Sequence, residues 1–159
     1  MARVELKKKI PDFEIEATGS KTVKLSALKG KNVVLYFYPK DSTPGCTLEG
    51  QDFRDNQTKF KRQNTVIFGV SRDSLKSHEN FKLKQNFPFD LISDPGETLC
   101  NLFAVIKMKN MYGKKVRGIE RSTFLIDEKG KLQHEWRGVK VKGHVDEVLE
   151  QVKILNKKS

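Results

Sequence analysis

Long apolar runs are missing from the sequence. No stretch approaches the roughly 20 apolar residues that a transmembrane helix needs, and the opening MARVELKKKIPDF has no apolar segment of secretory length. We therefore expect no membrane span, no secretory signal and a cytoplasmic protein. Only two cysteines occur, and because a cytoplasm keeps thiols reduced, we do not expect a permanent disulfide between them.

Internal repeats, low-complexity tracts and linker-like stretches are also missing. A chain of 159 residues has the length of one ordinary domain, and 36% hydrophobic residues with ten phenylalanines are sufficient for a core. We expect a single domain over residues 1–159.

Acidic residues are scarce relative to basic ones, which gives a net charge of +11. Such an excess is typical of nucleic-acid-binding proteins. The basic residues are scattered, however, with modest clusters at 7–9, 107–115 and 157–158, and no zinc finger or RNA-recognition signature occurs. We expect a solvated basic surface without specific nucleic-acid binding. A basic binding module on the same scaffold remains the second hypothesis.

Strand patterns alternate with helix patterns along the chain. The runs NVVLYFY (32–38) and TVIFGVSRD (65–73) are typical of strands buried on both faces, and FDLISD (89–94) is a shorter strand. Residues 74–87, 97–105 and 145–155 have helical spacing, whereas 13–28 and 122–136 indicate antiparallel hairpins. This order predicts an α/β, thioredoxin-like fold, with a central mixed sheet and helices on both faces.

The loop PKDSTPGC (39–46) follows the most hydrophobic of these strands. Thr43 is a good helix N-cap and Pro44 a good first helical residue, so Cys46 falls in the first turn of the predicted helix. Unpaired N–H groups and the helix dipole favour a thiolate there. A nucleophile at the carboxyl end of a central strand is the functional interpretation. The alternative is a buried packing residue.

Several other cysteine chemistries fit poorly. A dithiol oxidoreductase needs Cys-x-x-Cys, but Thr43 stands three residues before Cys46. A cysteine phosphatase needs Arg six residues after the nucleophile, where this chain has Asp52. Cys46 and Cys100 are 54 residues apart without paired histidines, so we expect no zinc or other metal site.

The three histidines lie in polar stretches of the sequence. We expect His78, His134 and His144 to be surface residues. A Cys-His hydrolase needs a positioned imidazole beside the nucleophile, so this reaction class is not favoured either.

Pro39, Thr43 and Cys46 reproduce the P-x-x-x-T-x-x-C motif of the peroxiredoxins. The longer stretch YFYPKDSTPGCTLEGQDFRD resembles the bacterioferritin comigratory protein or peroxiredoxin Q group. The similarity runs from PDF at Pro11 through GVSRDS, LISDP and ERSTFLID to the closing helix, nearly the whole chain.

This resemblance implies a role for each matching residue. Cys46 corresponds to the peroxidatic nucleophile, and the Thr43 hydroxyl and the Cys46 N–H correspond to groups that hold peroxide. Arg121 in ERSTF corresponds to the arginine that stabilises the thiolate; its alternative is an exposed residue at a strand start. Pro39 corresponds to a residue that shields the pocket, and Glu49 is placed to position Arg121. No metal, flavin or haem cofactor is expected.

One position departs from the resemblance. Many members of the group carry a resolving cysteine five residues after the nucleophile, where this chain has Gln51. The other thiol, Cys100, lies in ETLCNLF and is expected to be a packing residue; its alternative is to resolve Cys46 or bridge to another chain. A one-cysteine mechanism is therefore favoured, with thioredoxin, glutaredoxin or glutathione as external reductant.

The resemblance implies a thiol-dependent peroxidase that reduces hydrogen peroxide and organic hydroperoxides. We expect a monomer that acts in antioxidant defence and cell redox homeostasis.

Overall fold

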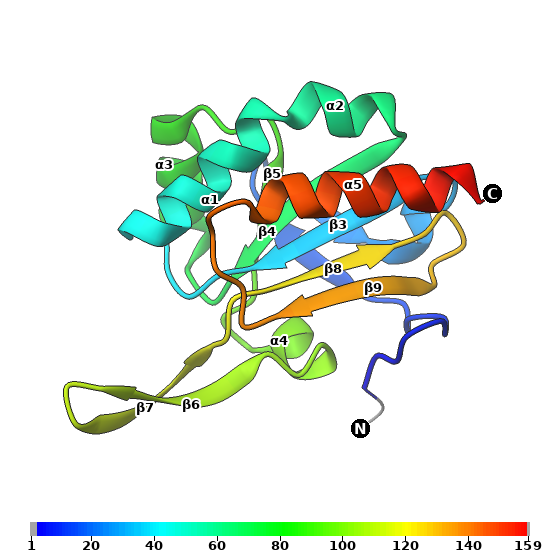
Figure 1. The fold of residues 1–159 in the computed structure, drawn as a ribbon. Helices are drawn as coiled ribbons and strands as arrows, with labels where there is room; N and C mark the ends of the chain where they lie inside the picture. The colour runs from blue at the N-terminus through cyan, green and yellow to red at the C-terminus, as the bar shows by residue number, and fades with distance from the viewer. Residues whose placement is uncertain (1–2, 159) are drawn as a thin grey trace.

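The computed structural model describes residues 3–158, which form one seven-stranded sheet and a separate two-stranded sheet (Figure 1). The strands of the large sheet are β1 (Glu14–Ala17), β2 (Lys21–Lys24), β3 (Asn32–Phe37), β4 (Thr65–Ser71), β5 (Asp90–Ser93), β8 (Ser122–Ile126) and β9 (Leu132–Arg137). Their order is β2-β1-β5-β4-β3-β8-β9. The parallel strands β3, β4 and β5 form the centre, and antiparallel strands flank them.

The helices are α1 (Pro44–Asp55), α2 (Gln57–Arg62), α3 (Leu75–Gln85), α4 (Thr98–Leu102) and α5 (His144–Lys157), with a 3-10 helix η1 (Leu25–Leu28). Side chains of α1, α2, α3 and α5 share one hydrophobic cluster, which covers one face of the sheet. The opposite face is covered by α4, η1 and the segment before β1. The predicted thioredoxin-like fold with a mixed sheet and helices on both faces is confirmed.

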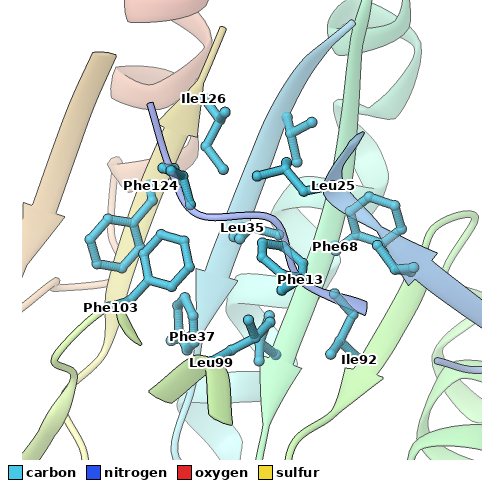
Figure 2. Packing of buried hydrophobic residues seen from close by; sticks show 14 of the residues in the cluster. Phe13, Leu25, Leu35, Phe37, Phe68, Ile92, Leu99, Phe103, Phe124 and Ile126 are labelled. Carbon is cyan, nitrogen blue, oxygen red and sulfur yellow. The ribbon is translucent and has the colours of Figure 1, made fainter. Parts of the chain in front are cut away.

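Strand β3 separates the two halves of the core. Its alternate residues Val33, Leu35 and Phe37 belong to the cluster around α4, shown in Figure 2. Val34 and Tyr36, with Tyr38 just after the strand, belong to the cluster around α1 and α5. Because successive strand residues point to opposite faces, a fully buried strand of this kind is apolar at every position.

The helix predicted to start before Cys46 is interrupted, although Cys46, Phe53 and Phe60 recur every seven residues, as expected on one helix face. It forms two helices, α1 and α2, which meet at Asn56. The Asn56 side chain donates a 2.8 Å hydrogen bond to the Asp52 carbonyl, and its backbone has φ −107° and ψ 4°. All three spaced side chains are nevertheless buried in one cluster.

A hairpin of β6 (Ile106–Met111) and β7 (Lys114–Ile119) forms the two-stranded sheet and extends away from the body (Figure 1). The sequence patterns did not predict it. The strands are mostly exposed and rich in lysine, so they lack the apolar face by which strands are usually identified.

Candidate active site

Cys46 lies in the first turn of α1, as predicted, at the carboxyl end of β3. Pro44 is the first helical residue, and Thr43 occupies the N-cap with an extended backbone. The Thr43 side chain does not cap the helix: its hydroxyl donates a 2.8 Å hydrogen bond to the Lys40 carbonyl. Thr43 is thus the N-cap residue by position, as predicted, but its hydroxyl closes the preceding turn instead of binding an N–H of the helix. Cys46 itself is only 1% exposed.

Arg121 reaches Cys46 because of strand register. It immediately precedes β8, whose first residue, Ser122, pairs with Phe37 at the end of β3. Since the two strands are antiparallel, Arg121 enters at the edge where α1 begins. Its Nη2 donates a 3.4 Å hydrogen bond to Cys46 Sγ. The side chain is 16% exposed, so the alternative of an exposed residue at a strand start is wrong.

Glu49 lies one helical turn beyond Cys46 and is completely buried. Its Oε1 accepts a 2.7 Å hydrogen bond from Arg121 Nη1, so one guanidinium binds both Glu49 and Cys46. The expected contact between Glu49 and Arg121 is confirmed. Burial raises the pKa of Glu49 to about 7, against the opposing charge and hydrogen bond of Arg121.

The guanidinium remains positively charged in this setting. Burial acts to lower the pKa of Arg121, but the neighbouring Glu49 and Cys46 outweigh it and raise the pKa above its usual value. A positively charged donor is thus fixed 3.4 Å from the sulfur.

Gly45 leaves space for the guanidinium above the start of α1. A Cβ at this position would lie 3.1 Å from Arg121 Nη2, closer than most Cβ contacts. Pro39 is half-buried and lies in the same loop between β3 and α1. Hydrogen bonds from Arg121 thus connect Cys46 and Glu49, and Pro39 and Thr43 lie in the loop that precedes them.

Cys100 lies on the other side of the sheet. It belongs to the cluster around α4, whereas Cys46 belongs to the cluster around α1 and α5. Its backbone N–H donates a 2.8 Å hydrogen bond to Asp94 Oδ2. Burial, helped by the charge of Asp94, raises the pKa of the Cys100 thiol far above its usual value. The side chain is completely buried, as expected of a packing residue.

Two of the three histidines expected on the surface are buried, and the expectation is wrong for both. His78 is 0% exposed and His144 is 3% exposed, while His134 is half-buried. His144 Nε2 lies 2.7 Å from Thr123 Oγ1. Burial and the charge of Arg121 lower the pKa of His144 to about 4, so this imidazole is neutral at pH 7.

His78 belongs to a hydrogen-bonded network that holds the loop before Cys46. Its Nδ1 lies 2.7 Å from Asp41 Oδ2, and its Nε2 lies 2.9 Å from the Ile92 carbonyl. Asp41 also accepts 2.7 Å bonds from Tyr38 and Ser77. A usable signal was present in the sequence, because His78 precedes Phe81 by three residues and so shares its buried helix face.

Asp41, Asp73 and His78 offer ligand atoms that lie within 4.8 Å of one another. Both ring nitrogens of His78 already have partners, and Asp73 Oδ2 accepts a 2.9 Å bond from the Asp41 N–H. The cluster is therefore a satisfied polar network, and we assign no metal to it. Within residues 3–158, no helix is both long enough and apolar enough to cross a membrane.

Comparison with known proteins identifies the family. A model of the AhpC/TSA family matches residues 6–135. The chain is 52% identical over 155 residues to peroxiredoxin Bcp of Bacillus subtilis, covering 98% of this chain and 99% of the relative. The chain belongs to the AhpC/TSA family. Its fold also matches the solved structure of Xanthomonas campestris peroxiredoxin Q, with a TM-score of 0.89, 51% identity and 98% of each chain covered.

A second Xanthomonas campestris structure places this peroxiredoxin in the same group. It is a bacterioferritin comigratory protein studied for alkyl peroxide reduction, with a TM-score of 0.89, 50% identity, and 98% of this chain and 99% of the other covered. The predicted membership in the bacterioferritin comigratory protein or peroxiredoxin Q group is confirmed. The peroxiredoxin is thus an enzyme, a thiol-dependent peroxidase.

Proposed function

We propose that Cys46 is the peroxidatic nucleophile of this peroxiredoxin and that Arg121 and Thr43 serve the same reaction. The observation that carries the proposal is the guanidinium of Arg121, which binds Cys46 Sγ at 3.4 Å and Glu49 Oε1 at 2.7 Å. One charged group is thereby fixed beside a sulfur at a helix N-terminus, where a thiolate is favoured.

The reaction begins when the Cys46 thiolate attacks one oxygen of a peroxide. An S–O bond forms, the O–O bond breaks, and two electrons pass from sulfur to the peroxide. The second oxygen leaves with negative charge, takes up a proton and departs as water or alcohol. Arg121 and the N–H groups at the start of α1 stabilise this developing charge. Cys46 becomes a sulfenic acid.

Hydrogen peroxide and small organic hydroperoxides are the proposed substrates. The resemblance to a relative studied for alkyl peroxide reduction supports the organic class. Thr43, through its hydroxyl, and the Cys46 N–H are the proposed peroxide-binding groups, and half-buried Pro39 is proposed to shield the pocket. Glu49 is a positioning residue that acts through Arg121.

An external thiol completes the cycle in this proposal. Cys100 is separated from Cys46 by the sheet, and Gln51 donates a 2.9 Å hydrogen bond to Gln85 in place of a thiol. The external thiol attacks the sulfenic sulfur, forms a mixed disulfide and releases water. A second thiol then breaks this disulfide, restores Cys46 and leaves the reductant as a disulfide. Thioredoxin, glutaredoxin and glutathione are the proposed reductants.

Access to the oxidised sulfur requires a local opening. The Cys46 side chain is 1% exposed, so an attacking thiol reaches it only after the first turn of α1 unwinds. We propose that the enzyme that performs this one-cysteine cycle is a monomeric, single-domain cytoplasmic protein that acts in antioxidant defence and redox homeostasis.

The test is a single-turnover experiment on the reduced protein. One equivalent of hydrogen peroxide or cumene hydroperoxide is added, and the products are identified by intact mass and non-reducing peptide mapping. The proposal expects a sulfenic acid at Cys46 with Cys100 unmodified, and no turnover in Cys46→Ser. A Cys46–Cys100 disulfide would overturn the one-cysteine route, and undiminished peroxide consumption by Cys46→Ser would overturn the assignment of the nucleophile.

A further inference from the structure

The hairpin of β6 and β7 is the part of the molecule that the proposed chemistry does not use. Its strands pair only with each other, from Ile106 with Ile119 to Met111 with Lys114, among the described residues. Figure 1 shows it extending away from the large sheet. An isolated two-stranded hairpin is marginally stable in water, so its projection without a covering layer calls for an explanation.

The hairpin concentrates exposed apolar side chains. Within residues 3–158, seven large hydrophobic side chains are exposed, and four of these lie on the hairpin: Met108, Met111, Tyr112 and Val116. Single exposed apolar residues are ordinary, but a group of them on one projecting element is typical of an interaction surface.

The same segment is strongly basic. Residues 106–119 contain five basic side chains and no acidic one: Lys107, Lys109, Lys114, Lys115 and Arg117. Arg117 pairs with Glu97 in the body of the protein. Lys107, Lys114 and Lys115 are exposed and form no ion pair with any described residue. Three positive charges thus remain available to an acidic partner.

The tip of the hairpin carries an aromatic ring at an unfavourable position. Tyr112 and Gly113 form the two-residue turn, with φ angles of 52° and 79°. Such turns favour Asn-Gly, and a bulky residue at positive φ is uncommon. The Tyr112 side chain is fully exposed, so no packing within the described chain compensates for this choice.

The base of the hairpin adjoins the Cys46 site. Strand β7 ends at Ile119, two residues before Arg121, and Lys109 Nζ donates a hydrogen bond to the Ile119 carbonyl. Burial, and after it the charge of Arg121, lower the pKa of Lys109. Leu48, two residues after Cys46 in α1, is also exposed. The exposed surface of the hairpin therefore leads toward the reactive sulfur.

We propose that the β6–β7 hairpin is the docking surface for an acidic protein that carries the reducing thiols. This inference rests on the proposed function, in which oxidised Cys46 has no partner thiol within reach in its own chain. A protein held on the hairpin, close to the start of α1, delivers its thiol where the first turn opens. Its two thiols supply the two electrons of the reduction already described, leaving Cys46 as a thiol and the partner as a disulfide.

Side-chain chemistry favours a protein partner over nucleic acid. Methionine is enriched in the centre of protein interfaces and adapts to irregular surfaces. Met108, Met111 and Val116 present no flat ring on which a base stacks, and Tyr112 alone does so. The lysines add attraction for an acidic surface and accelerate its association.

The test compares two reductants on matched charge variants. Lys107→Glu, Lys114→Glu and Lys115→Glu are combined in one hairpin variant. Lys29→Glu, Lys31→Glu and Lys129→Glu form the control; these lysines are exposed near the start of β3, at the opposite end of that strand from Cys46. Both variants change the net charge equally. Peroxide turnover is measured with an acidic thioredoxin, kept reduced by its reductase and NADPH, and separately with dithiothreitol.

The hairpin variant is expected to raise KM for thioredoxin by about ten-fold or more and to lower the salt dependence of that reaction. The turnover of the hairpin variant with dithiothreitol stays within about two-fold of wild type. The control variant stays within about two-fold of wild type with both reductants, because exposed charges are screened over distance. A second variant, Met111→Ser with Tyr112→Ser, is expected to raise the same KM without altering the dithiothreitol reaction.

Unchanged thioredoxin kinetics in the hairpin variants would overturn the docking proposal, as would an equal loss with both reductants. If the hairpin variant no longer bound immobilised single-stranded DNA as the wild type does, while its thioredoxin kinetics stayed unchanged, the surface would be assigned to nucleic acid. That result would also overturn the docking proposal. Failure of the wild type to turn over peroxide with either reductant would instead refute the proposed function, which separates the two claims.

Discussion

Arg121 binds only one of the two carboxyl oxygens of Glu49. Oε1 accepts the 2.7 Å hydrogen bond from Arg121 Nη1, whereas Oε2 is buried and has no hydrogen-bond partner among the described residues. An unsatisfied buried oxygen costs less on a neutral carboxylic acid than on a carboxylate. This geometry agrees with the raised pKa of Glu49, about 7.

Replacing Glu49 by glutamine is expected to change how stability depends on pH. The pKa of Glu49 rises from 4.5 in the unfolded chain to about 7 on folding. Between these values the unfolded state is ionised and the folded state binds a proton, so the wild type loses stability as pH rises. Relative to Glu49→Gln, its free energy of unfolding falls by on the order of 2–3 kcal/mol. Urea unfolding of both proteins from pH 4.5 to 8 measures the difference, and parallel curves would contradict it.

Replacing Arg121 by lysine is expected to slow the oxidation of Cys46. A lysine keeps the positive charge but lacks the planar fork that binds Cys46 and Glu49 at once. The second-order rate constant with hydrogen peroxide falls by about 10²–10³-fold, the effect of losing one fixed donor at a developing charge. Single-turnover peroxide consumption measures it. Arg62→Lys, at the exposed end of α2, serves as control, and equal rates in the two variants would contradict the role of Arg121.

Cys100→Ala is expected to retain peroxidase turnover with an external thiol. The side chain is buried on the opposite face of the sheet from Cys46, and its raised pKa keeps it as the unreactive thiol. Steady-state turnover with dithiothreitol is expected to stay within about two-fold of wild type, and the melting temperature to fall slightly through lost packing. In native wild type, iodoacetamide alkylates Cys46 before Cys100, as mapped by mass spectrometry. A large loss of turnover in Cys100→Ala would reinstate it as the resolving residue.

The local parts of the site are predictable from sequence, and the long-range parts are not. Apolar strand residues followed by Thr43 and Pro44 specify the start of α1 within a few residues, because strand and helix signals act locally. Arg121 approaches Cys46 across 75 residues of sequence, through the pairing of β3 with β8. No periodicity encodes that contact; the resemblance to the peroxiredoxins placed it.

Polar residues misled the prediction where they are buried in pairs. His78 was expected on the surface because an imidazole, like the carboxylate of Asp41 beside it, is expensive to bury alone. Together the two side chains satisfy each other's hydrogen bonds, which offsets the cost of burying them. This pairing can be recognised only when α3 and the loop before α1 are placed side by side. The hairpin of β6 and β7 was missed for the opposite reason, since its apolar residues face solvent and leave no buried stripe in the pattern.

Breaking the pair between His78 and Asp41 is expected to destabilise the protein strongly. The Ile92 carbonyl only accepts hydrogen bonds, so His78 Nε2 is the donor there, and one further proton lies between His78 Nδ1 and Asp41 Oδ2. His78→Leu leaves the buried carboxyl group without this partner and lowers the free energy of unfolding by about 3–5 kcal/mol. Ser77→Ala, which removes one neutral donor to the same oxygen, lowers it by only about 1 kcal/mol.

Urea unfolding at pH 7 compares the two variants with the double variant His78→Leu, Asp41→Leu. The double variant is expected to be more stable than His78→Leu, since it no longer buries an acid that has lost its histidine partner. Additive losses would show that the two side chains do not act as a pair.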